Sequence, residues 1–290
     1  MTDAYARPEA LVSTEWLAAH LDDADLRLLD GSFKMPGTTP SAADEYRSGH
    51  IPGAIFFDID VIADPNSPLP HMLPDAMAFG AAMGGLGIGA GDRVVIYDSA
   101  GVVSATRAWW MLRVFGHDRV AVLDGGLPKW RAEGRPVTAS VPTPGRRAFH
   151  VQFRRELVRT KAQLLANLES TAEQVLDART VERFEGRAAE PWPGRRSGRI
   201  PGSLNLPYSL LSNADNTFAP REELERRLAA AGVVAGKPVV TSCGSGVTAC
   251  VLAFGLYLTG RDDIAVYDGS WAEWGLPGDT PVATGTANKE

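Results

Sequence analysis

The residues best suited to chemistry are Cys243 and the loop that follows it, Gly-Ser-Gly-Val-Thr-Ala. A β-branched run precedes the loop and an apolar helical run follows it, so it should lie at the carboxyl edge of a sheet, where α/β sheets place ligands. Its two glycines let successive N–H groups point at one atom, and the helix N-terminus adds its dipole. The loop therefore favours a thiolate at Cys243 and could hold a persulfide. The expected binding positions are Gly244, Gly246, Val247 and Thr248.

Other interpretations of this cysteine are a core residue, a phosphatase or arsenate reductase nucleophile, and a non-enzymatic sulfur carrier. Cysteine phosphatases need an arginine six residues after the nucleophile to clamp oxygens, and that position here is Ala249. Cys250 is expected to be a small core residue on the following helix. A helix would separate the two cysteines by about 10 Å, too far for a disulfide.

Composition narrows the class of protein. The chain has 290 residues, 44% of them apolar and 22% charged, and a net charge of −6. We expect two soluble domains, with no nucleic-acid or membrane partner, because the charge is acidic and the longest apolar run, 249–258, is short. No secretory signal is visible, so we expect a cytoplasmic protein. Five scattered histidines and two cysteines predict no metal and no cofactor.

The chain repeats itself once. Segment 94–102 corresponds to 239–247, 122–130 to 266–274, and 49–54 to 198–203, in the same order. Asp98 stands where Cys243 stands in the second copy, and a carboxylate cannot act as a sulfur nucleophile. The sequence therefore predicts a duplicated domain with an inactive first copy.

Each copy alternates strand patterns with helix patterns. In the second copy, 174–177, 238–242 and 264–267 are typical of buried strands, and 220–231 and 248–259 of helices. This alternation predicts an α/β fold with two tandem domains, each a parallel sheet with helices on both faces. We expect domains at 1–135 and 161–290, joined by a Pro- and Arg-rich linker at 136–160.

Several motifs together resemble the tandem-rhodanese sulfurtransferases, and among these the 3-mercaptopyruvate branch. They are Ser13–Leu17, Gly49–Gly53, Phe56–Ile59, Ser67–Pro74, Asp124–Gly126 and Cys243–Ala249. In that family the thiosulfate branch has Arg-Lys after the cysteine, where this chain has Gly244 and Ser245. The resemblance implies two rhodanese folds and an active site between them. It also implies sulfur transfer from 3-mercaptopyruvate to cyanide or a thiol such as thioredoxin or glutathione, with thiosulfate as the alternative donor.

The resemblance also implies residue roles. Cys243 would take sulfur from the donor as a persulfide, and Ser245 would either hydrogen-bond the departing enolate or relay a proton to it. His50 would reach the site from the first domain to work with Ser245. An arginine surplus over 179–199 is a plausible anion site, and Arg183 matches one substrate-binding arginine of the family. The second family arginine usually follows Glu-Pro, where this chain has Trp192, so Arg195 is the candidate to replace it.

Overall fold

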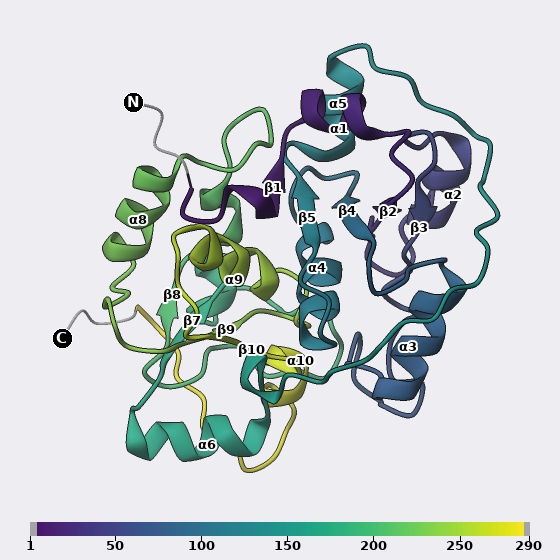
Figure 1. The fold of residues 1–290 in the computed structure, drawn as a ribbon. Coiled ribbons are helices and arrows are strands. Elements are labelled where there is room, and N and C mark those ends of the chain that lie inside the picture. Colours follow the sequence, from purple (N-terminus) through teal and green to yellow (C-terminus); the bar gives the residue numbers. More distant parts are fainter. Residues whose placement is uncertain (1–4, 287–290) are drawn as a thin grey trace.

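The computed structural model describes residues 5–286, which form two α/β halves lying side by side (Figure 1). Each half contains a five-stranded sheet in which all the pairings are parallel. The first sheet has the order β1 (Leu11–Val12), β5 (Val120–Leu123), β4 (Arg93–Tyr97), β2 (Leu26–Asp30), β3 (Ile55–Phe56). The second repeats this order with β6 (Val158–Arg159), β10 (Ile264–Tyr267), β9 (Val239–Ser242), β7 (Gln174–Asp177), β8 (Leu204–Asn205).

Helices connect the strands in both halves. The first half contains α1 (Thr14–His20), α2 (Ala42–Ser48), α3 (Ala76–Gly85), α4 (Ala105–Val114) and α5 (Gly126–Ala132). The second contains α6 (Lys161–Ser170), α7 (Val181–Phe184), α8 (Arg221–Ala230), α9 (Ala249–Leu258) and α10 (Ser270–Trp274). Ser13, Ser41 and Asp75 begin α1, α2 and α3, because each side chain accepts the N–H group three residues on. The predicted α/β fold is confirmed, and so are the strands and helices expected in the second copy.

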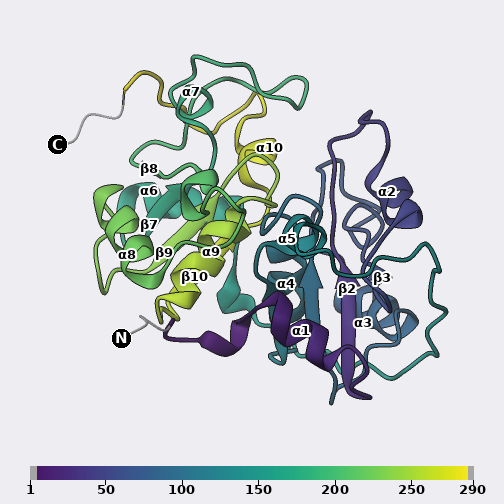
Figure 2. The same cartoon turned by 90° about the horizontal axis from the view of Figure 1, so that it is seen from above.

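The two faces of each sheet bury different helices. Along β4, Val94 and Ile96 face α3 and α4, whereas Val95 and Tyr97 face α1 and α5. The second sheet alternates in the same way, with α8 and α9 on one face and α6 and α10 on the other. The α4 and α9 faces belong to one continuous apolar cluster that spans both halves. Figures 1 and 2 show these two helices packed side by side at the centre of the molecule.

The segment between the halves runs along the first one. After α5 it contains no regular element until a short 3-10 helix, and it bonds to the first half where Arg147 N–H donates to Gly84 and Arg154 N–H to Val114. The last residues of the stretch 136–160 form β6, the edge strand of the second sheet. Within residues 5–286, no helix is both long enough and apolar enough to span a membrane.

Candidate active site

The cysteine loop is held from behind by the turn between β10 and α10. Cys243 N–H donates to the Ser270 hydroxyl (3.1 Å), and that hydroxyl donates to the carbonyl of Tyr267. The carbonyls of Cys243 and Gly244 accept from the N–H groups of Trp271 and Ala272. These contacts fix the first residues of the loop, and Cys243 is almost completely buried.

The backbone requires glycine at one position of the loop, Gly246, and the other glycine, Gly244, lies against an arginine. Gly246 has φ +80°, and a Cβ there would lie 2.7 Å from the carbonyl oxygen of Asp268. A Cβ at Gly244 would lie 2.8 Å from the guanidinium of Arg183. Within residues 5–286, the N–H groups of residues 244–248 donate to no other protein group. The loop therefore offers a set of unused donors beside the sulfur, as an anion requires.

A histidine of the first half reaches Ser245 across the interface, and it is His71. Its Nδ1 lies 3.1 Å from the Ser245 hydroxyl oxygen, and its Nε2 lies 3.0 Å from a carboxylate oxygen of Asp60. His71 and Ser245 are buried, whereas the Asp60 side chain is 56% exposed. The contact with Ser245 is a hydrogen bond, whereas the contact with Asp60 is an ion-pair distance without hydrogen-bond geometry. Ser245, His71 and Asp60 thus lie in a row from the cysteine loop to solvent, which is the arrangement that a proton path requires.

The expected contact between His50 and Ser245 is absent, and this prediction is corrected. His50 is fully buried, its Nδ1 lies 2.7 Å from the carbonyl of Tyr46, and its Nε2 lies 3.2 Å from that of Ser140. Its backbone pairs with Thr138, just as Arg199 at the equivalent place in the second copy pairs with Ala283. His50 is therefore a structural residue of the repeat.

The expectation for His50 was wrong because His50 lies at the opposite edge of the first sheet from the site. His50 precedes β3, so it lies at the amino edge, whereas Asp60 and His71 follow β3 and lie at the carboxyl edge. A signal for His71 existed, because it falls in the motif 67–74 between a strand and a helix. For Asp60, the only sign in the sequence of a role in the site was its position shortly after β3.

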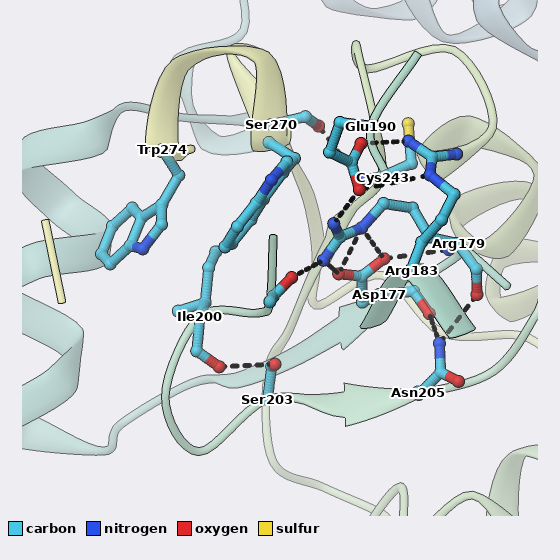
Figure 3. Close-up of polar contacts among 12 residues, drawn as sticks. Asp177, Arg179, Arg183, Glu190, Ile200, Ser203, Asn205, Cys243, Ser270 and Trp274 are labelled. Atoms are coloured by element: carbon cyan, nitrogen blue, oxygen red, sulfur yellow. Dashed lines mark hydrogen bonds and ion pairs between the residues drawn. The ribbon is translucent and has the colours of Figure 1, made fainter. Parts of the chain in front are cut away.

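Arg183 is the cation next to the loop. It sits on α7, and its Nε and one terminal nitrogen donate to the two oxygens of Glu190. Its other terminal nitrogen, Nη1, makes no hydrogen bond within residues 5–286. Figure 3 shows Arg183 and Glu190 beside Cys243. The free nitrogen can bind a carboxylate.

The other predicted arginine has a different environment. Arg195 donates from Nε to the carbonyl of Ala272 (3.0 Å) and from Nη1 to that of Pro193 (2.7 Å). Ala272 in turn donates to Gly244, so Arg195 supports the loop from behind. The ring of Trp192 lies edge-on to the ring of His71, with 5.9 Å between centroids. An aromatic side chain therefore stands beside the proton path.

The remaining candidates around Cys243 are structural. Arg179 is buried between Asp177 and Glu190 and stacks on Trp271. Cys250 is fully buried, its thiol lies 3.3 Å from the carbonyl oxygen of Gly246, and burial raises the pKa of that thiol well above its ordinary value. Within the described residues, no group of three acidic, histidine or cysteine side chains could hold a metal ion.

The duplicated sheets agree with the comparisons with known proteins. The rhodanese-like domain family matches residues 13–133 and 160–276. This chain belongs to the rhodanese family. Two matched copies confirm the tandem-rhodanese fold expected from the sequence.

Related rhodanese proteins cover nearly the whole chain. A thiosulfate/3-mercaptopyruvate sulfurtransferase of Arabidopsis thaliana, named as mitochondrial, is 43% identical over 97% of this chain and 80% of its own length. The 3-mercaptopyruvate sulfurtransferase of Escherichia coli is 41% identical over 93% of this chain and 96% of its own. A crystal structure of the E. coli 3-mercaptopyruvate sulfotransferase covers 91% of this chain and 99% of its own, with a TM-score of 0.83 and 37% identity. These relatives confirm the sulfurtransferase class.

Proposed function

We propose that this rhodanese is a 3-mercaptopyruvate sulfurtransferase that works through a persulfide on Cys243. The observation that carries the proposal is the path Ser245, His71 and Asp60 beside the cysteine loop. Only a donor whose leaving group is a strong base needs a proton at that place, and the enolate of pyruvate is such a leaving group. The names of the relatives support the same donor.

The first half-reaction loads the enzyme. The Cys243 thiolate attacks the sulfur of 3-mercaptopyruvate, a new S–S bond forms, and the C–S bond breaks with its electron pair moving to carbon. The resulting enolate takes a proton from Ser245, which is replenished by His71, and leaves as pyruvate. The N–H groups of residues 244–248 hold the persulfide anion, and the free nitrogen of Arg183 binds the donor carboxylate.

The second half-reaction unloads it. An acceptor thiolate attacks the outer sulfur, so that the sulfur moves to the acceptor and Cys243 is restored as a thiolate. A thiol such as thioredoxin or glutathione is our proposed acceptor, with cyanide serving in an assay. We further propose a cytoplasmic site of action, which fractionation of the source cells would test.

Thiosulfate is the second candidate donor, because two relatives are named for both donors and another for thiosulfate alone. Thiosulfate carries two charges close to its transferable sulfur and needs cations beside the nucleophile. Gly244 and Ser245 supply none, and Arg183 offers one free nitrogen, which suits the single carboxylate of mercaptopyruvate. Trp192, which stands where the family usually has its second arginine, adds no positive charge. We therefore expect a higher kcat/KM for mercaptopyruvate.

The phosphatase alternative lacks its arginine, because Ala249 is a buried residue that begins α9. The sulfur-carrier alternative differs from transfer only in turnover. Intact mass after addition of mercaptopyruvate should rise by one sulfur on Cys243 and return to its starting value when a thiol is added. No adduct with either donor would overturn the proposal. A tenfold or greater preference for thiosulfate in kcat/KM would overturn the donor alone.

A further inference from the structure

Arg107 is a completely buried arginine that crosses the interface between the two halves. It lies on α4, and one terminal nitrogen, Nη1, is 2.8 Å from Asp268 of the second half. The same nitrogen donates to the carbonyl of Gly246 (3.2 Å) in the cysteine loop. Its other terminal nitrogen donates to the carbonyl of His71. One side chain therefore contacts both the loop of Cys243 and the backbone of the histidine that meets Ser245.

Asp268 holds the same segment from its other oxygen, which accepts the N–H group of Leu73 (2.8 Å). The segment 71–73 is thus held at two points by Arg107 and Asp268. His71 has φ +60°, a left-handed conformation that a side chain adopts only when its surroundings hold it there. Without these contacts His71 can relax to an ordinary backbone conformation, and its ring would move away from Ser245.

The charge of Arg107 is maintained inside the protein. Burial alone lowers the pKa of its guanidinium, but Asp268 raises it, and the net pKa lies above the ordinary value. Burying such a pair costs desolvation free energy, because both charges lose their contacts with water. Apolar residues of similar size often stabilise an interface equally well. The pair therefore calls for a reason other than interface stability.

The equivalent contact beside the inactive loop of the first copy shows how the interface is built where no chemistry occurs. Arg107 is the third residue of α4, and the third residue of α9 is Val251. Asp124 is the counterpart of Asp268, and it too accepts an N–H group across the interface, from Phe218 (2.8 Å). Within residues 5–286, Asp124 forms no ion pair. The hydrogen bond from Phe218 to Asp124 joins the two halves without an arginine, so Arg107 is not needed to join them.

We propose that Arg107 and Asp268 are positioning residues that hold His71 against Ser245 for the sulfur-loading step. The inference rests on the proposed function, because it assigns these residues to the proton path of that reaction. Lysine cannot replace arginine here, since a single ammonium cannot reach the carbonyls of Gly246 and His71 in the same fork. Arg107→Lys should therefore keep the charge and lose the position.

A double-mutant cycle tests this role. The rate of persulfide formation on Cys243 from mercaptopyruvate is measured by mass in single turnover for the wild type, Arg107→Lys, Ser245→Ala and the double variant. Arg107→Lys should slow loading at least about tenfold in the wild type and less than about twofold in Ser245→Ala, because the path is already broken there. Equal losses in the two backgrounds would overturn the inference, and no persulfide in the wild type would overturn the proposed function instead.

Arg113→Lys is the matched control. Arg113 lies on the same helix and also faces the second half, over the ring of Tyr257, but it contacts neither loop of the site. The Arg113→Lys change should slow loading less than about twofold, both in the wild type and in Ser245→Ala. The same background-dependent loss in Arg113→Lys would overturn the inference, because it would show a general effect of the interface.

A second variant keeps the test valid if Arg107→Lys does not fold. Arg107→Met combined with Asp268→Asn leaves no buried charge, and the Asn oxygen still accepts from Leu73. We expect its thermal midpoint to stay within a few degrees of wild type while loading falls at least about tenfold, again only when Ser245 is present. Wild-type loading in this folded variant would overturn the inference.

Discussion

The loops at Asp98 and Cys243 occupy the same place in two copies of one fold, yet they use their backbone donors differently. The carboxylate of Asp98 accepts the N–H groups of Ala100, Val103 and Ala105, each at 2.8 Å. Burial raises the pKa of this carboxyl, and those N–H groups oppose the rise. In the second copy the N–H groups of residues 244–248 donate to no protein group of the described residues 5–286. The first copy thus fills its anion cradle with its own side chain, and the second leaves the cradle to sulfur.

The two loops also differ in length and bulk. Six residues separate Asp98 from α4, and five separate Cys243 from α9. Gly244 corresponds to Ser99, and the guanidinium of Arg183 lies close to Gly244. The active copy has therefore a tighter loop that admits a cation from α7.

The largest effect should come from making the second loop like the first. Cys243→Asp should reduce sulfur transfer below about one thousandth of wild type, because a carboxylate forms no persulfide. The free energy of unfolding at pH 7 should be retained, since the new carboxylate can accept the unused N–H groups. Intact mass and urea unfolding measure the two results. Cys250→Ala is the control, with most of the activity kept, and equal losses in both variants would contradict the assignment of the nucleophile.

The next effect separates the two histidines. His71→Gln should lower kcat with mercaptopyruvate by about 10²- to 10³-fold, because it breaks proton delivery to Ser245. His50→Gln should leave kcat within about threefold and lower the thermal midpoint, because it removes only buried structural contacts. A larger kcat loss for His50→Gln than for His71→Gln would restore the assignment made from the sequence.

A smaller effect concerns the cation that only the second copy has. Arg183→Ala should cost about 2–4 kcal/mol in kcat/KM for mercaptopyruvate, because the donor carboxylate loses a charged hydrogen bond and Glu190 loses one of its two arginines. The control is Arg187→Ala, because Arg187 is an exposed arginine that pairs with Glu185. An unchanged kcat/KM for Arg183→Ala would remove Arg183 from the binding site.

The smallest effect concerns Asp124 and Asp268, the two aspartates that accept an N–H group from the opposite half. Burial raises the pKa of Asp124 from about 3.8 to about 6, so the folded protein binds this proton more tightly than the unfolded chain does. Stability is therefore lost as pH rises from about 4 to about 6, and it stays lost above that range. Asp124→Asn should raise the free energy of unfolding by about 1–3 kcal/mol at pH 8 and hardly at pH 4.

Urea unfolding at the two pH values checks this prediction. Asp268→Asn is the matched change in the other copy, and it should destabilise the protein at pH 8, because Arg107 is left without its carboxylate. A gain for Asp124→Asn that is the same at pH 4 and pH 8 would mean that ionisation of Asp124 is not its cause.

The sequence by itself determined the features that are local or repeated. The duplication, the strand and helix pattern and the loop at Cys243 could all be predicted, because hydrophobic period and glycine spacing act over neighbouring residues. Arg183 was also found near the loop, through its motif. The same reasoning placed Arg195 at the substrate, whereas its hydrogen bonds support the turn behind the loop.

The tertiary structure alone decided which residues of the first half complete the site. Asp60, His71 and Arg107 lie more than a hundred residues from Cys243, and they meet it only because the carboxyl edge of one sheet faces the loop of the other across α4 and α9. His50 has the right chemistry and a stronger motif, but it lies on the wrong side of β3. Side-chain type is written in the sequence, whereas the edge of the sheet that a side chain reaches is set by strand direction and packing.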